Sequence, residues 1–173
     1  MSGRNGRAGR NLGDLVFLAI PFGRYSELPV QAFTGTIVLD AGNYYPQRDG
    51  QITELDNHES TTSEILARHL SGARVVKASN AILGRDLTAH SHPDSSMWRR
   101  ALPIAGDDAD AKRRVIKLHE RFGFDVVDAG ALAEGHSFER ARSAYCRALD
   151  IAGLREALAD DGPDQLEGAW RVC

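Results

Sequence analysis

Runs of apolar residues that end in small or turn-forming residues recur along the chain. The first is LVFLAI, from Leu15 to Ile20, and Pro21 and Gly23 close it. An uninterrupted apolar run of strand-forming residues is typical of a strand that is buried on both faces. We therefore expect this strand to have neighbours on two sides, although only a dozen mostly polar, glycine-rich residues precede it.

Four further β-rich runs follow, with helical patterns between them and a last helical pattern at 151–158. The runs are TIVLDAG at 36–42, ARVVKAS at 73–79, ALPIAG at 101–106 and DVVDAG at 125–130. Strands that alternate with helices imply βα units, and hence a mostly parallel sheet with helices on its faces. The predicted fold class is α/β.

Polar residues mark where two of the helices should begin. Thr61 and Glu64 have the spacing of a capping box ahead of EILARHL. Asp107 or Asp108 can cap a second helix, which Gly123 is placed to end. Because the two aspartates fall where a helical pattern starts, we interpret them as caps rather than as catalytic acids.

Residues that follow the strands are the candidates for ligand contact, because open α/β sheets bind ligands beyond the carboxyl ends of their strands. These segments are IPFG, DAGNYYP, KASN, AGDD and DAG, in chain order. Simpler interpretations exist: Pro21 can merely punctuate a loop, and Asn43 and Asn80 can bond their own backbone in turns. We interpret Lys77 as the solvated end of a strand rather than as a base.

Five segments together carry a family resemblance that extends from about residue 12 to residue 158. They are VFLAIPFGRY, IVLDAGNYYPQRDG, TSEILARHLSGARVVKASNAI, RRALPIAGDDADAK and GFDVVDAGALAEG. This succession resembles the NADPH-dependent coenzyme F420 reductases and their NADP-binding oxidoreductase relatives. The resemblance implies a Rossmann-like domain that moves a hydride between the nicotinamide of NADP and the deazaflavin coenzyme F420. In such reactions the cofactors carry the chemistry and the protein supplies orientation.

The resemblance also implies which residues contact the cofactors. The backbone of Ile20, Pro21 and Phe22 would pass along the nicotinamide nucleotide, with Pro21 fixing the turn. Asn43 and Asn80, after the next two strands, would face the same pocket. No side chain is implied as a catalytic acid or base.

The sequence departs from the family at two points. Relatives read KAFN where this chain reads KASN, so Ser79 replaces an aromatic residue. In the family the LAIPFG strand is the fourth, after a βαβαβ half whose G-x-G-x-x-G turn cradles the pyrophosphate. No two glycines of this chain are separated by a single residue. We therefore expect an incomplete domain at 13–160, between a disordered arm at 1–12 and a polar tail at 161–173.

Two hypotheses about function follow. The chain is an NADP-dependent oxidoreductase whose missing half lies upstream or comes from a partner, or it is a non-catalytic fragment that binds NADP weakly or acts only with a partner. If the first strand starts the sheet, its unpaired apolar edge favours association. A homo-oligomer formed through this strand is therefore a further expectation.

Composition narrows the class of partner. The chain has 173 residues, of which 42% are hydrophobic and 26% charged, which is typical of one globular domain. Its net charge of -3 argues against nucleic acid or anionic lipid as a partner, and favours small-molecule cofactors. The sequence has neither an apolar run of membrane-spanning length nor a signal-peptide pattern. We expect a cytoplasmic protein.

Other motifs add no chemistry. Cys146 and Cys173 form no close-spaced pair, and we interpret both as free thiols. The tract HSHPD at 90–94 lies in a loop without a third histidine, so we predict no metal site there. H-E-x-x-H, G-x-S-x-G and G-x-x-x-x-G-K motifs are all missing, which leaves hydrolase and nucleotidase functions without a sequence signal.

Overall fold

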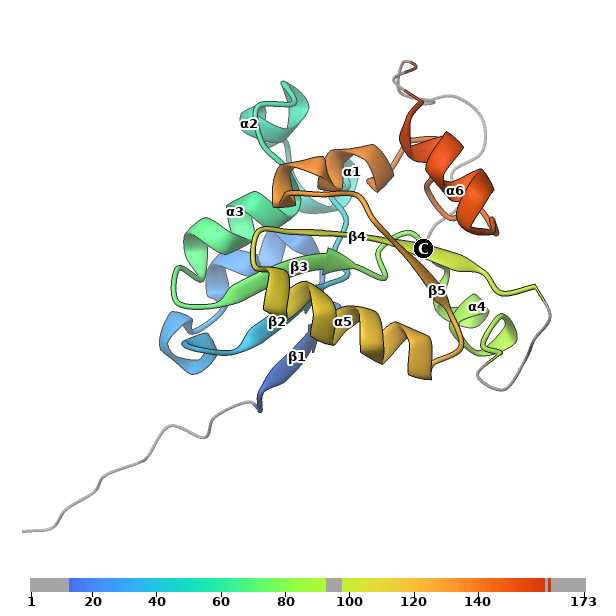
Figure 1. Ribbon diagram of the computed structural model, residues 1–173. Coiled ribbons are helices and arrows are strands. Elements are labelled where there is room, and N and C mark those ends of the chain that lie inside the picture. The colour runs from blue at the N-terminus through green and yellow to red at the C-terminus, as the bar shows by residue number, and fades with distance from the viewer. Residues whose placement is uncertain (1–12, 93–97, 161, 163–173) are drawn as a thin grey trace, which may run out of the picture.

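The structure is a computed structural model that describes residues 13–92, 98–160 and 162 (Figure 1). The strands are β1 (Leu15–Leu18), β2 (Ile37–Asp40), β3 (Arg74–Ala78), β4 (Ala101–Gly106) and β5 (Asp125–Asp128). The α-helices are α1 (Pro46–Asp49), α2 (Thr53–Asp56), α3 (Thr62–His69), α4 (Gly84–Ala89), α5 (Ala109–Arg121) and α6 (Ile151–Leu158). The 3-10 helices are η1 (Phe22–Glu27), η2 (Val30–Phe33) and η3 (Leu132–Phe138). The predicted arm and, apart from Gly162, the predicted tail lie outside the described residues.

The described strands form one sheet in the order β1-β2-β3-β4-β5. β1, β2 and β3 are parallel, β4 is antiparallel to β3, and β5 is parallel to β4. This confirms the predicted α/β class with a mostly parallel sheet. It also corrects the prediction that all five strand-following segments are candidates for contact with one ligand, because β4 and β5 run opposite to the first three strands. The segments AGDD and DAG therefore lie beside the amino ends of the first three strands, whereas IPFG, DAGNYYP and KASN lie at their carboxyl ends.

Helices cover both faces of the sheet (Figure 1). On one face Leu66 of α3 and Leu70, directly after it, pack against Val38 and Val75. On the other face Val115 of α5 packs against Ile37, Leu39, Val76 and Ile104. Adjacent strand residues thus enter different cores, as the alternation of side chains along a strand requires. Lys77, two residues after Val75, is on the α3 face.

The predicted helix starts are confirmed at atomic detail. Thr61 Oγ1 accepts from the Glu64 N–H at 3.2 Å, and Glu64 Oε2 accepts from the Thr61 N–H at 2.8 Å, which completes the capping box. Asp108 Oδ1 accepts from the Ala111 N–H at 2.7 Å at the start of α5. Asp107 instead accepts from the main-chain N–H of Leu132 at 2.8 Å. Local polar residues therefore fix where both helices begin.

β1 is the edge strand of the described sheet, and the prediction that both of its faces are buried is wrong. Leu18 is buried in the core on the α3 face, but Phe17, which points the other way, is 44% exposed. The reason is that α5 packs mainly over β3, β4 and β5, and β1 has a neighbouring strand on one side only in the described sheet. The edge strand therefore presents an apolar side chain to solvent.

The prediction of two free thiols is wrong for Cys146, which is buried and disulfide-bonded. Cys173 lies outside the described residues.

Two negative findings concern the described part of the chain. None of its helices combines the length and the apolar character that crossing a membrane would require. Nor do three or more histidine, cysteine, aspartate or glutamate side chains gather there as a metal ion would need. His90, from the histidine tract, has its Nδ1 3.0 Å from Nη1 of Arg100.

Candidate functional site

Two of the predicted site residues meet at the carboxyl edge of β2 and β3. The Asn43 side-chain amide donates to the main-chain oxygen of Asn80 at 3.0 Å. In return the Asn80 amide donates to Asn43 Oδ1 at 3.2 Å, and also to the main-chain oxygen of Phe138 at 3.0 Å. Both side chains are buried, with 8% and 1% of their surface exposed. The two loops are therefore locked together at the edge where the sequence placed a ligand.

The predicted site residues after β1 differ in what they expose. Pro21 is exposed and Ile20 is half-buried. Phe22 is 4% exposed, and its ring packs against Tyr25 with the centroids 4.8 Å apart. A ligand at this turn can therefore reach the main chain of Phe22 but not its ring, which belongs to the core on the α3 face.

One buried acceptor at this edge has no partner within the described residues. Asn80 Oδ1 is enclosed by protein and accepts no hydrogen bond there. Buried polar atoms are almost always satisfied, so an exception points to a missing donor from water or a ligand. The asparagine pair therefore carries one enclosed acceptor that could take a hydrogen bond from a buried water.

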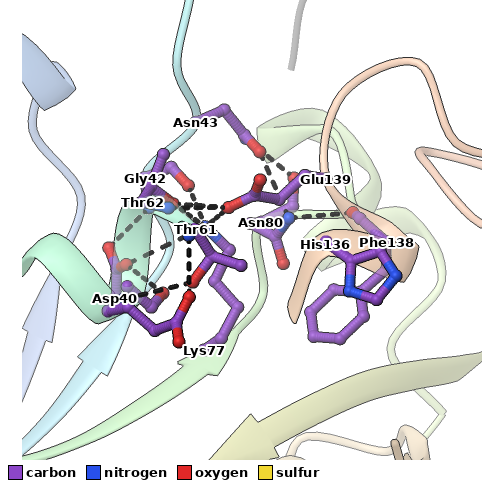
Figure 2. Close-up of polar contacts among 12 residues, drawn as sticks. Asp40, Gly42, Asn43, Thr61, Thr62, Lys77, Asn80, His136, Phe138 and Glu139 are labelled. Atoms are coloured by element: carbon purple, nitrogen blue, oxygen red, sulfur yellow. Dashed lines mark hydrogen bonds and ion pairs between the residues drawn. The ribbon is translucent and has the colours of Figure 1, made fainter. Parts of the chain in front are cut away.

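Lys77 lies beneath this edge and is fully buried, so the interpretation of a solvated strand end is wrong (Figure 2). Its ammonium donates to the main-chain oxygen of Gly42 at 2.7 Å and to Thr62 Oγ1 at 2.6 Å. Carboxylate oxygens of Glu139 and Asp40 lie 3.3 Å and 3.8 Å from Nζ. A buried ammonium needs such partners, because an unpaired charge in the interior is very unfavourable.

Asp40 holds the other side of this network. Its carboxylate accepts from the Ser63 hydroxyl at 2.6 Å, from the Gly42 N–H at 2.9 Å and from the Tyr25 hydroxyl. Burial raises the pKa of the Tyr25 phenol, and the charge of Asp40 raises it further. The phenol therefore stays protonated and donates. Asp40 in this way ties the end of β2 to η1 and to the start of α3.

Glu139 connects the network to the surface. Its Oε1 accepts from the Thr62 N–H at 3.2 Å and from the Thr62 hydroxyl at 2.7 Å, and its side chain is 21% exposed. It follows η3 and lies 77 positions from Thr62 in the sequence. Sequence reasoning missed the contact of Glu139 with Thr62, because the two residues are far apart in the sequence and no motif links them.

Glu139 also lines a cleft of about 670 Å³. This volume is within the usual range for a small-molecule site. The cleft is lined by Tyr44, Pro46, Leu55, Asp56, His58, Glu59, Ser60, Thr61, Glu64, Ala133, His136, Glu139, Arg140, Ala141 and Arg142. None of the five predicted site residues is among them. Glu139, which does line the cleft, lies beside the asparagine pair in Figure 2.

Comparison with known proteins places the fold. No protein-family model matches the chain. The hypothetical protein SMa0349 from Sinorhizobium meliloti is 30% identical, with a TM-score of 0.69 over 80% of this chain and 67% of that one. The chain belongs to the same family as SMa0349. This membership brings no function with it, because the relative is itself a hypothetical protein.

Two proteins with named functions are more distant. A candidate F420-dependent NADP-reductase from Arthrobacter sp. FB24 has a TM-score of 0.58 at 21% identity, over 70% of this chain and 57% of that one. The metalloreductase STEAP3 of Rattus norvegicus is 29% identical over 128 residues, which are 73% of this chain and 24% of STEAP3. The chain thus spans about a quarter of that relative. The fold is Rossmann-like, as the structural likeness shows and as the sequence predicted.

Proposed function

We propose that the chain is the nicotinamide-side part of an NADP(H)-dependent oxidoreductase. It transfers a hydride between NADPH and coenzyme F420 or a similar acceptor, in the cytoplasm. The observation that carries this proposal is the reciprocal pair of Asn43 and Asn80 at the carboxyl edge of a Rossmann-like sheet. The reductase names of one structural neighbour and of one curated relative support the same reaction class.

The residues at this edge suit the nicotinamide half of the cofactor. Asn43 and Asn80 fix the loops that follow β2 and β3 at this edge. The main chain of Ile20, Pro21 and Phe22 borders the same edge. The sequence has no glycine cradle for the pyrophosphate. The residues at this edge therefore suit the nicotinamide half of NADP(H) better than the pyrophosphate. When bound, the cofactor itself would supply the hydride.

The role of the protein in this reaction is to hold and orient. The asparagine amides are fixed by three hydrogen bonds of 3.0 to 3.2 Å, so their direction is set before a ligand arrives. Such preorganisation lowers the entropy cost of positioning a ring for transfer. Lys77, with its partners, holds the loop of Gly42 that leads to Asn43.

The test is an anaerobic absorbance assay of the 173-residue chain with NADPH and coenzyme F420. We expect loss of the NADPH and F420 absorbance bands at equal rates that depend on the concentration of the chain. Asn80→Ala removes the hydrogen bonds to Asn43 and to the main chain of Phe138 that orient this edge. It should lower the rate about tenfold or more, since a loss of about 1.4 kcal/mol in the transition state equals a tenfold loss.

A matched control is Asn57→Ala, which removes an exposed asparagine amide that bonds Glu59 at 2.9 Å. This variant should keep the full rate. Circular dichroism establishes that Asn80→Ala is folded before its rate is interpreted. Equal rates for both variants, or no transfer by the unmodified chain, would contradict the proposal.

A further inference from the structure

A serine and a histidine that are 40 positions apart in the sequence meet on the α5 face of the sheet. Ser79 Oγ lies 2.8 Å from Nε2 of His119. Ser79 directly follows β3, and His119 is in the last turn of α5. Neither belongs to a catalytic motif in the sequence.

The hydrogen bonds of His119 determine where its proton lies. Nδ1 is 2.8 Å from the main-chain oxygen of Val115, which can only accept, so Nδ1 carries the proton. Nε2 therefore presents a lone pair, and the Ser79 hydroxyl donates to it. Burial lowers the pKa of His119, which keeps the ring neutral at pH 7. This arrangement of hydroxyl, imidazole base and orienting acceptor is the one that activates a serine nucleophile.

The backbone at Ser79 aims the hydroxyl away from the face expected for it. Side chains alternate along β3, so Ser79 should share the α3 face with Lys77. Instead its φ is 58°, in the left-handed region, and the hydroxyl meets α5. A non-glycine residue in this region is strained and often functional. The resemblance to F420 reductases does not account for Ser79, because relatives carry an aromatic residue there.

A pocket of about 370 Å³ adjoins the pair. Ser79 and His119 are among its lining residues, and most of the others are apolar, including Leu39, Phe122 and Phe124. In contrast to the cleft beside Glu139, this pocket has no aspartate, glutamate, lysine or arginine among its lining residues. The pocket has the size and the character to take a short apolar acyl chain with its carbonyl near the serine.

We propose that Ser79 and His119 form a nucleophile and base that hydrolyse small esters of apolar acids. Ser79 Oγ attacks the ester carbonyl carbon while its proton passes to His119 Nε2. The C–O bond to the alcohol then breaks, and the alcohol leaves with that proton. Water attacks the acyl-Ser79 ester, gives its proton to His119, and the acid leaves as Ser79 recovers the proton. This activity is independent of the proposed hydride transfer.

The first test needs no variant. The intact chain is incubated with a fluorophosphonate probe, which phosphonylates activated serines, and the modified peptide is mapped by mass spectrometry. We expect modification of the peptide that contains Ser79. An unmodified chain, or a label confined to another serine, would overturn the proposal.

The second test measures hydrolysis of p-nitrophenyl butyrate. Ser79→Ala and His119→Gln should each lower the rate above buffer about 100-fold or more, the usual cost of losing a nucleophile or base. Ser137→Ala is the control, because that hydroxyl bonds the main-chain oxygen of Glu134 at 2.8 Å, away from the pocket. Rates that stay equal in all three variants would show that any hydrolysis arises elsewhere.

Discussion

The buried Lys77 allows the strongest quantitative prediction. We consider Lys77→Met, which removes the ammonium and keeps an unbranched apolar side chain of similar length. The substitution leaves the Gly42 carbonyl without its donor at 2.7 Å and Thr62 Oγ1 without its donor at 2.6 Å. It also leaves Asp40, with no exposed surface, and Glu139 without their nearby positive charge.

The expected loss of stability follows from how deeply Lys77 and its partners are buried. Removing one partner of a buried ion pair costs about 3–5 kcal/mol. Glu139 is 21% exposed, so water can replace part of what it loses, and Asp40 retains three other donors. We therefore expect Lys77→Met to lower the free energy of unfolding by about 3 kcal/mol, at the lower end of this range. For a chain of this size that corresponds to a melting temperature lower by about 6–12 °C.

The assay is urea unfolding followed by circular dichroism, with the slope m compared between variants. Lys112→Met is the matched control, because it makes the same chemical change where the partner carboxylate of Asp128 is 41% exposed. A partly exposed pair of this kind contributes about 1 kcal/mol or less. If both variants lost the same free energy, or if Lys77→Met lay within 0.5 kcal/mol of the unmodified chain, the buried network would not hold the site as described.

Three further predictions test other parts of the account. Thr61→Ala removes the capping acceptor of α3 and should cost about 1 kcal/mol in urea unfolding; no measurable cost would contradict the capping box. Burial lowers the pKa of His119 in the folded state, so the unfolded chain binds the proton more readily. The free energy of unfolding should therefore decrease as the pH falls below about 6.5, and His119→Gln should decrease less. Phe17 is exposed on an edge strand, so light scattering at micromolar concentration should detect association that Phe17→Lys reduces; a monomer throughout would contradict the edge argument.

Local signals made part of the structure predictable. Strand-forming runs located all five described strands, and the polar residues Thr61, Glu64 and Asp108 located two helix starts. The family resemblance named Asn43 and Asn80, which follow two neighbouring strands, and the structure brings them into contact. These features depend on residues close in sequence or on the rule that parallel strand ends share an edge.

The rest depends on contacts between distant residues. ALPIAG is apolar throughout, and such a run does not encode strand direction, so the antiparallel β4 was not foreseen. Lys77 was interpreted as a solvated strand end because hydride transfer between the two cofactors needs no side-chain base. Its partners come from three other segments, one of them more than 60 positions away at Glu139. The contact of Ser79 with His119 likewise needed the fold.

The most direct test of the proposed function is calorimetry of the 173-residue chain with the two halves of the cofactor. The chain is titrated separately with reduced nicotinamide mononucleotide and with 2′,5′-ADP. We predict saturable heat with the nicotinamide half, because the proposal places it at the edge that carries Asn43 and Asn80. We predict no heat with the adenosine half, because the sequence lacks the glycine cradle. Binding of 2′,5′-ADP without binding of the nicotinamide half would contradict the central claim.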